Sequence, residues 1–262
     1  MAEHLAVVVP AFNEEDSIER VLQSLHNQKG NSLDRVFMVN NASTDNTVNA
    51  AEMFASYHPD FPLTIIDEPE QGTGSAADTG FLRAIDEGYE LIARTDGDTQ
   101  PTADWSQRIV TTLNRKPHVQ LLGGSRLPLK DESYRPHDAL LWPIGMAIGD
   151  LACRLLTNGR RGRRIVAGHN MATRAEAYET VGGFPRTRIE DADEDAVYAE
   201  RVVAAYGIDA VEAPRDIQVR TSMRRLRRLG YVGYFGYRFD SLVSDGRRTR
   251  EIESLILEQD LQ

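Results

Sequence analysis

Two aspartates separated by one glycine, Asp96-Gly97-Asp98, have the residue types of a site for a divalent cation. They follow the stretch 90–95, which we predict to be a buried strand. Hard cations prefer carboxylate oxygens, and a cation held there can bridge to phosphate oxygens. The glycine would let a ligand approach the backbone closely. Taken alone, however, the tripeptide is more typical of an ordinary Asp-Gly turn, so its surroundings decide its chemistry.

Two further polar loops follow apolar stretches in the same way. One runs from Pro10 to Glu15 after a strand predicted over 5–9, and the other from Asn40 to Thr47 after a strand predicted over 35–39. Asx turns and helix N-caps explain each loop by itself, because Asn, Ser, Thr and Asp favour them. They do not explain why three such loops would lie at one edge of a sheet.

The elements that position these loops alternate between strands and helices. Strands are predicted over 5–9, 35–39, 63–67 and 90–95. The first helix follows the loop that ends at Glu15, with Asp16 and Glu19 as a capping box. It carries apolar residues at the spacing of one helix face, namely Ile18, Val21, Leu22 and Leu25.

The second helix is expected to carry Val48, Ala51 and Ala55, and the third to span 74–87 before Gly88 as its C′ residue. Such alternation predicts an α/β fold with a Rossmann-like, mainly parallel sheet flanked by helices. Ligands of these sheets bind beyond the carboxyl ends of the strands, so the three loops should converge on one crevice.

The second half of the chain has a looser, α+β pattern. We expect a strand over 119–123, a helical stretch near 139–157, a strand near 165–173 and a short helix before Gly182-Gly183-Phe184. Further helices are expected over 224–228 and 249–259. Because neither repeats nor a Ser/Gly/Pro-rich linker separate the halves, we expect one domain over 1–262. Its parts would be a nucleotide-binding lobe (1–125), a smaller acceptor and catalytic lobe (126–222) and a helical tail (223–262).

Three of these segments together resemble the family-2 glycosyltransferases of GT-A fold. They are Val8 to Glu15, the Ser43-Thr44-Asp45 loop and Asp96-Gly97-Asp98, the last corresponding to the family's DXD motif. The resemblance covers roughly residues 5–125 strongly and 165–205 moderately. It implies a hexosyltransferase-like enzyme that moves a sugar from a nucleotide-diphosphate sugar to an acceptor hydroxyl with inversion, using Mn²⁺ or Mg²⁺.

The resemblance also implies residue roles. It assigns these residues to the nucleotide-sugar donor: Pro10, Ala11, Phe12, Glu14, Asn40, Asn41, Gly72, Thr73, Asp96 and Gly97. Asp98, with Asp96, is expected to hold the metal. On the acceptor side it implies Glu194, with Asp195 as the catalytic base that takes the proton of the attacking hydroxyl. His169 and Asn170 lie where the resemblance places contacts with the donor sugar or the acceptor. For His169, a surface histidine with satisfied partners is the favoured interpretation.

Two Glu-Asp pairs compete for that last role, Glu190-Asp191 and Glu194-Asp195. Only the second leaves Arg201 at the family's usual offset of seven residues from the glutamate. A structural explanation also exists for the acidic run, because carboxylates are stabilised at helix N-termini.

Departures from the family pattern leave parts of this interpretation open. Asn40-Asn41 stands where many relatives have paired aspartates, so the nucleobase is not fixed. Ala77-Asp78 stands where relatives often have Arg-Asn, so a usual donor contact is missing. No histidine follows His169, although many relatives use a late histidine as an extra metal ligand. Metal binding would therefore depend mainly on Asp98.

Composition and charge limit the class of binding partner and the cellular location. The formal charge of −10 and pI of about 5.1 argue against a nucleic-acid partner. The single cysteine, Cys153, can form no internal disulfide and is expected to be a small buried residue. The chain shows neither a signal-peptide pattern nor an uninterrupted apolar stretch long enough for a membrane span. We therefore expect a cytoplasmic protein that could also lie peripherally at a membrane.

Two features have several interpretations. The basic cluster Arg224 to Arg228, interleaved with later aromatic residues, could hold a diphosphate, contact an anionic membrane or form a solvated amphipathic helix, and the last is favoured. Trp142 and its apolar helix could form an acceptor wall or the face of a homodimer. The acceptor itself could be a saccharide, a lipid carrier or a small molecule.

Three alternative functions stay open. A retaining glycosyltransferase of the same fold is the first, because sequence does not fix stereochemistry. A sugar-nucleotide pyrophosphorylase should carry a Gly-rich loop with Arg and Lys after its first strand, which Pro10 to Glu15 is not. A non-catalytic nucleotide-sugar binder is the third. Residues 72–77 also fit a dinucleotide-binding pattern, but they follow the third strand, which argues against a dehydrogenase.

Overall fold

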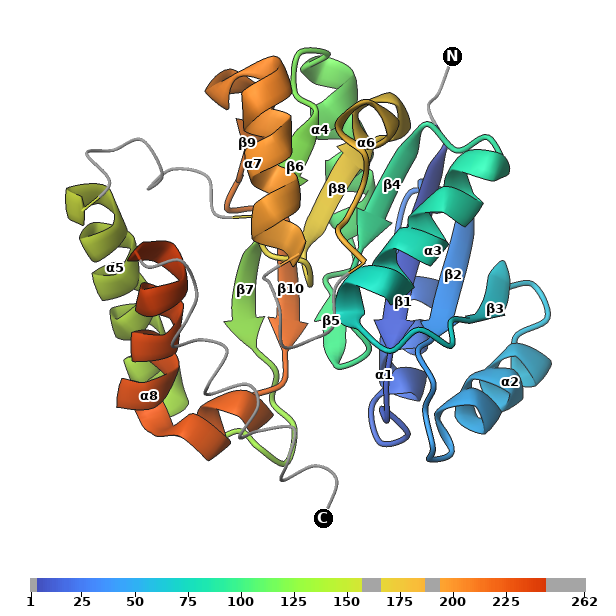
Figure 1. Ribbon diagram of the computed structural model, residues 1–262. Coiled ribbons are helices and arrows are strands. Elements are labelled where there is room, and N and C mark those ends of the chain that lie inside the picture. The colour runs from blue at the N-terminus through green and yellow to red at the C-terminus, as the bar shows by residue number, and fades with distance from the viewer. Residues whose placement is uncertain (1–3, 157–165, 187–193, 244–262) are drawn as a thin grey trace.

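The main sheet has seven strands in the order β3-β2-β1-β4-β8-β6-β9 in the computed structural model, which describes residues 4–156, 166–186 and 194–243 (Figure 1). Its strands are β1 (Leu5–Ala11), β2 (Arg35–Asn40), β3 (Leu63–Asp67), β4 (Leu91–Arg94), β6 (Leu121–Gly123), β8 (Met171–Arg174) and β9 (Val211–Glu212). Strand β8 runs antiparallel to both its neighbours, whereas every other pair in the sheet is parallel. The predicted mainly parallel α/β sheet is therefore confirmed.

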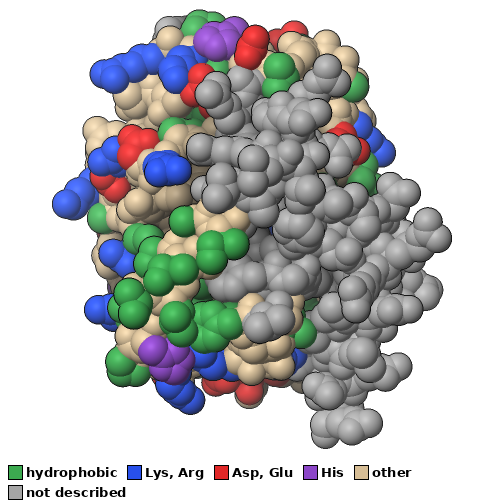
Figure 2. All heavy atoms as spheres, turned by 90° about the vertical axis from the view of Figure 1, so that its left-hand side faces the viewer, with side chains coloured by type: hydrophobic (Ala, Val, Ile, Leu, Met, Phe, Trp, Pro, Cys, Tyr) green, Lys and Arg blue, Asp and Glu red, His purple; other side chains and the backbone are tan. Residues whose placement is uncertain are grey.

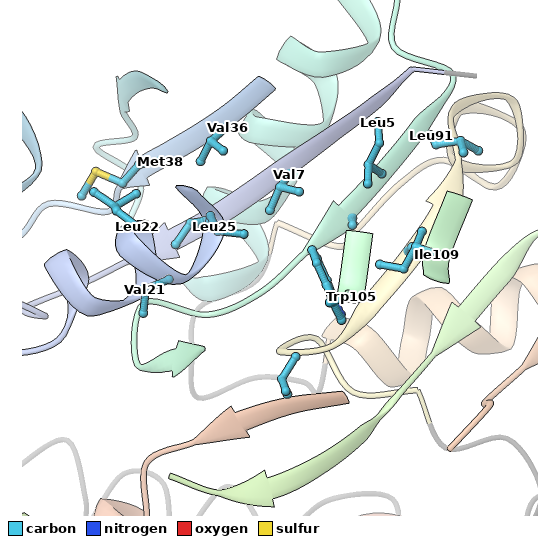
Figure 3. Close-up of a cluster of buried hydrophobic side chains, with 14 of the residues drawn as sticks. Leu5, Val7, Val21, Leu22, Leu25, Val36, Met38, Leu91, Trp105 and Ile109 are labelled. Atoms are coloured by element: carbon cyan, nitrogen blue, oxygen red, sulfur yellow. The ribbon is translucent and has the colours of Figure 1, made fainter. Parts of the chain in front are cut away.

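Helices cover both faces of this sheet because its central strands are apolar on both sides. Side chains alternate along β1, so that Leu5, Val7 and Val9 face one layer while Ala6 and Val8 face the other. The first layer contains α1 (Ile18–His26), α2 (Thr47–Tyr57) and α4 (Trp105–Arg115). Figure 3 shows how apolar side chains of α1 and α4 lie beside those of the strands. The second layer contains α3 (Thr73–Asp86), α6 (Ala175–Val181) and α7 (Glu194–Tyr206).

The expected face of α1 is confirmed, since Ile18, Val21, Leu22 and Leu25 are all buried. The predicted capping box is wrong. Ser17 rather than Asp16 precedes the first turn, and no side chain among the described residues caps it. Gly88 follows α3 with φ 86°, a left-handed conformation that suits the predicted C′ glycine.

A second, three-stranded sheet was not expected from the sequence. It joins β5 (Thr99–Pro101), β10 (Gln218–Thr221) and β7 (Ser125–Pro128) in the order β5-β10-β7. Strand β5 follows the aspartate motif directly, so the pairing of Thr99 with Thr221 brings residues near 220 beside it. This sheet crosses the boundary at residue 125 that we predicted between two lobes, and the division into lobes stays a prediction.

Two helices, α5 (Asp138–Leu156) and α8 (Arg224–Val243), pack against each other beside this second sheet (Figure 1). Asp138 is fully buried and accepts hydrogen bonds from Arg227 and Tyr231. Trp142 itself is buried against Tyr234 and Arg126. The role of its helix, as an acceptor wall or the face of a homodimer, stays a prediction. The outer face of α5 is apolar (Figure 2), with exposed Leu140, Leu141, Ile144 and Ile148.

Some predictions fall on residues that the structure does not describe. Glu190-Asp191, the terminal helix over 249–259 and the side chain of Cys153 lie outside the described residues. The predicted strand near 165–173 is shorter, because only Met171–Arg174 pairs in the sheet. A short 3₁₀ turn, Ile208–Ala210, completes the described elements. No helix within the described ranges has both the length and the apolar character that a membrane crossing needs.

Candidate functional site

The loops after β1, β2 and β4 meet at the carboxyl edge of the sheet, as predicted. The backbone N–H of Gly97 donates to the carbonyl oxygen of Pro10 (3.2 Å), and that of Asn41 donates to Ala11 (2.9 Å). A Cβ atom on Gly97 would lie 3.0 Å from Cγ of Glu14 and 3.3 Å from the Pro10 oxygen. Glycine is therefore what lets the aspartate motif lie directly against the first loop.

The Ser43-Thr44-Asp45 loop shapes the first loop through reciprocal hydrogen bonds. The backbone N–H of Asn13 donates to Oγ of Ser43 (3.1 Å), and the N–H of Glu15 donates to Oδ2 of Asp45 (3.1 Å). Burial alone would raise the pKa of Asp45, but hydrogen bonds from Thr47 and from the backbone hold it below its ordinary value. This ionised carboxylate is thus a structural clamp between two loops.

The aspartate motif presents its two carboxylates differently. Asp98 accepts a hydrogen bond from Oγ1 of Thr99 (2.9 Å), and that hydroxyl lies 3.0 Å from Oγ1 of Thr221 in the second sheet. Asp96 instead accepts from Nε of Arg94 (3.2 Å). Both side chains are partly accessible, 34% for Asp96 and 27% for Asp98, so ligand oxygens or a cation can reach them.

Arg224 lies between Asp98 and Glu14. Its Nη2 atom is 2.7 Å from Oε2 of Glu14 and 3.3 Å from Oδ2 of Asp98. Burial, followed by the charge of Asp98, raises the pKa of Glu14 to about 7, although Arg224 opposes the shift. Two carboxylates therefore converge on one position that already attracts a cation. This contact involves the first residue of the basic cluster 224–228. The interpretations given above for the cluster as a whole stay open.

Arg94, which we did not predict, connects this edge to the second half of the chain. Its side chain is 2% exposed, and its Nη1 donates to Oε1 of Glu194 (2.9 Å) while its Nε donates to Asp96. Burial alone would lower the pKa of Arg94, but the charges of Asp96, Glu194 and Asp195 raise it above its ordinary value. The Asp96-Gly97-Asp98 and Glu194-Asp195 motifs thus share one guanidinium.

Asp195 lies at the start of α7, where backbone groups hold its carboxylate. The N–H of Gly168 donates to Oδ2 (2.7 Å), and the N–H of Ala196 donates to Oδ1 (2.7 Å). Arg201, whose spacing favoured this Glu-Asp pair, donates to the carbonyl oxygens of Gly182 and Gly183 (3.2 and 2.9 Å). Hydrogen bonds to Asp195 and from Arg201 therefore hold the start of α7 and its later turns in place.

His169 and Asn170 differ in what they can offer. Burial and the charge of Arg126 lower the pKa of His169 to about 3, although Asp98 opposes the shift, so the imidazole is neutral near pH 7. Asn170 is 1% exposed, accepts from Nε1 of Trp105 (2.9 Å) and donates to the backbone of Ser125 and Ile217. This geometry argues against an acceptor-side role for Asn170, which instead ties the two sheets together.

Asn40 and Asn41 are also engaged within the protein. Asn40 donates to Asp67 (2.8 Å) and accepts from the backbone of Ser43. Asn41 donates to the carbonyl oxygens of Glu68 and Glu70, and its own oxygen accepts from the N–H of Gly72 (2.7 Å). The amide of Asn41 is thus used to shape the loop before Thr73, which argues against a direct contact with the base edge.

Asp78, which stands where relatives often have asparagine, has an arginine partner from another segment. Nη1 of Arg186 donates to Asp78 (3.2 Å), and its Nη2 donates to buried Glu68 (2.8 Å). Burial would raise the pKa of Glu68, but hydrogen bonds from Thr79 and Arg186 hold it below its ordinary value. Arg186 thus fastens α3 to the segment that follows Gly183 and Phe184.

Solved structures show the same fold. A mannosyltransferase of Pyrobaculum calidifontis, solved with GDP-mannose and Mn²⁺, is similar with a TM-score of 0.63 and 25% identity over 90% of this chain and 64% of that one. Glucosyl-3-phosphoglycerate synthase of Mycobacterium tuberculosis, in complex with Mn²⁺, UDP and glucosyl-3-phosphoglycerate, has a TM-score of 0.61 and 17% identity over 93% and 82% of the two chains. The fold is that of the GT-A glycosyltransferases.

Residues 6–182 match the model of glycosyl transferase family 2, and the chain belongs to that family. Among curated relatives, glycosyltransferase AglE of Haloferax volcanii is 26% identical over 193 residues, which are 72% of this chain. The chain spans 58% of the length of that relative.

Proposed function

We propose that this chain transfers a sugar from a nucleotide-diphosphate donor to an acceptor hydroxyl, with inversion and with a divalent metal. One observation carries the proposal: the carboxylates of Asp96 and Asp98 lie at the carboxyl edge of the sheet, and Arg94 joins Asp96 to Glu194 beside Asp195. The proposed metal ligands and the proposed base are thus connected through one side chain. Family membership and the fold support the same reaction class.

The residues present fit a hard divalent cation. Asp98 and Asp96 offer carboxylate oxygens, which Mn²⁺ and Mg²⁺ prefer. The guanidinium of Arg224 between Asp98 and Glu14 indicates that this position favours positive charge. Among the described residues no group of three or more His, Cys, Asp and Glu side chains forms a metal cluster, so substrate oxygens would complete the coordination. When bound, the metal would stabilise charge on the departing diphosphate.

The remaining chemistry falls to the side chains of the chain itself. Asp195 is the proposed base, since a fixed carboxylate can accept the proton of an attacking hydroxyl. The hydrogen bonds from Gly168 and Ala196 orient its carboxylate at the start of α7. The loop of Pro10, Ala11 and Phe12 is the proposed nucleoside wall, with Gly72 and Thr73 at the start of α3 beside the diphosphate.

Ligand binding is the first test. We expect UDP or GDP to raise the melting temperature in the presence of Mn²⁺, because a ligand that binds only the native state stabilises it. Asp98→Asn should weaken nucleotide binding at least tenfold and so reduce the rise in melting temperature. If none of UDP, GDP, ADP, CDP and dTDP stabilises the protein with Mn²⁺, the proposed donor class is wrong.

Stereochemistry and turnover form the second test. With the donor selected by binding, NMR of the product should show an inverted anomeric centre. Asp195→Asn should lower kcat by two to four orders of magnitude, roughly the contribution of a general base, with nucleotide affinity unchanged. A retained configuration would instead support the retaining alternative, and binding without any nucleotide release would support a non-catalytic binder.

A further inference from the structure

Arg94 is a buried charge at the end of an apolar strand. The three residues before it in β4 are apolar and fully buried, and Arg94 itself is 2% exposed. An unpaired buried charge is costly, so such a residue persists only with well-placed partners. Its partners therefore indicate why it lies there.

Two different nitrogens of Arg94 reach two different motifs. Nε is 3.2 Å from Oδ1 of Asp96, and Nη1 is 2.9 Å from Oε1 of Glu194, which is 100 positions away in the sequence. The guanidinium is planar and rigid, so the positions of its nitrogens fix the separation of the two carboxylates. A flexible cation with one nitrogen could neutralise both charges but could not set this spacing.

The space around the guanidinium is shaped to hold it. A Cβ atom on Gly168 would lie 2.6 Å from Cζ of Arg94, so only glycine leaves room there. The ring of Phe184 lies on another side, with Cζ 5.8 Å from its centroid. Gly168 also donates its N–H to Asp195, and the fixed guanidinium and the proposed base therefore share a neighbour.

We propose that Arg94 is a positioning residue, which sets the donor-side Asp96 at a fixed distance from the acceptor-side pair Glu194-Asp195. This inference rests on the proposed function, because it assumes that nucleotide binds at Asp96 and acceptor at Asp195. Changes at Glu194 are then transmitted to the nucleotide through Arg94.

A thermodynamic cycle tests this coupling without turnover. The dissociation constant of Mn²⁺ with UDP or GDP is measured by calorimetry for wild type, Glu194→Gln, Arg94→Lys and the double variant. We expect Glu194→Gln to change the dissociation constant about fivefold in the wild type and less than twofold beside Arg94→Lys. An equal effect in both backgrounds would overturn the proposal, because it would mean that Glu194 acts without Arg94.

A conservative substitution of Arg94 gives a second readout. Arg94→Lys keeps the charge but not the two-nitrogen bridge, so we expect kcat for nucleotide release from UDP-glucose or GDP-mannose to fall at least tenfold, with KM within threefold. Arg174→Lys on β8 is the matched control, because that guanidinium donates to the backbone oxygens of Val119 and Leu113. Its kcat should not change. A wild-type kcat in Arg94→Lys would show that only the charge is needed.

Folding and the proposed function are checked separately. If Arg94→Lys lacks a cooperative melting transition, the cycle is run with Gly168→Ala, whose methyl group would displace the Arg94 guanidinium. The same loss of coupling is expected, and undiminished coupling overturns the inference. If the wild type binds none of UDP, GDP, ADP, CDP and dTDP with Mn²⁺, the proposed function fails and this inference fails with it. If the wild type binds and the cycle shows no coupling, only the inference fails.

Discussion

Two arginines neutralise carboxylates at this site, and their surroundings differ. Arg94 is 2% exposed and joins two motifs, whereas Arg224 is 45% exposed and lies between Glu14 and Asp98. Removing one partner of a buried ion pair leaves a charge without solvent, while an exposed pair is screened by water. The comparison indicates that the inner pair belongs to the framework and that the outer pair can be exchanged.

The largest expected difference is in stability. Arg94→Met leaves the carboxylates of Asp96 and Glu194 without their buried partner, so we expect the free energy of unfolding to fall by about 3–5 kcal/mol. Arg224→Met should cost no more than about 1 kcal/mol, because solvent replaces that partner. Urea denaturation of both variants measures the difference, and equal losses would remove the distinction between the pairs.

The pH dependence of stability distinguishes the Arg224–Glu14 pair from the Arg94 pairs next. The pKa of Glu14 is about 7 in the folded protein, raised from an ordinary value of 4.5 that also describes the unfolded chain. The stability from protonated Glu14 is therefore fully present below pH 4.5 and is lost as pH rises through about 7. This loss is on the order of 3 kcal/mol from the relation between pKa and free energy. Denaturation from about pH 4 to about pH 8 should show it, and Glu14→Gln should flatten that part of the profile.

Packing around Arg94 and its carboxylate partners should give an intermediate effect on stability. Gly168→Ala places a methyl group against the Arg94 guanidinium, so we expect about 2 kcal/mol of destabilisation. Gly233→Ala is the control, because its Cβ would meet only ordinary contact with Leu229 at 3.4 Å. Melting temperatures of the two variants compare them, and a wild-type value for Gly168→Ala would show that Arg94 can move.

The smallest effect concerns metal affinity at the outer pair. Arg224→Gln removes a cation that Mn²⁺ would have to displace, so the protein without nucleotide should bind Mn²⁺ about three- to tenfold more tightly, an exposed ion pair being worth roughly 1 kcal/mol. Arg220→Gln, on β10, is a nearby control for the loss of one positive charge. Unchanged Mn²⁺ affinity in Arg224→Gln would mean that the metal binds elsewhere.

Local patterns predicted much of the fold. The strands predicted in the first half agree within two residues at each end with those of the structure, because each contains an apolar run that is bounded by a polar loop. The helix α4 was missed although Trp105, Ile109 and Leu113 lie on one face. The second sheet was missed because its strands are three or four residues long and pair across more than 90 positions.

The site was predicted less completely, because side-chain partners depend on tertiary contacts. Asn41 has the residue type of a base contact, yet the backbone of the loop before Thr73 takes up its amide. Arg94 had one local signal, a charge in an otherwise apolar strand, but nothing local could identify Glu194 as its partner. Motif spacing therefore located the edge of the sheet better than it assigned individual contacts.

Arg224 is also the first residue of α8, the helix that packs on α5. When the charge balance between Glu14 and Asp98 changes, the pull on the start of α8 changes with it. A probe attached to the outer face of α5 would therefore test whether a change of charge at Glu14 or Asp98 is felt by the helical pair, although α8 bends at Gly230.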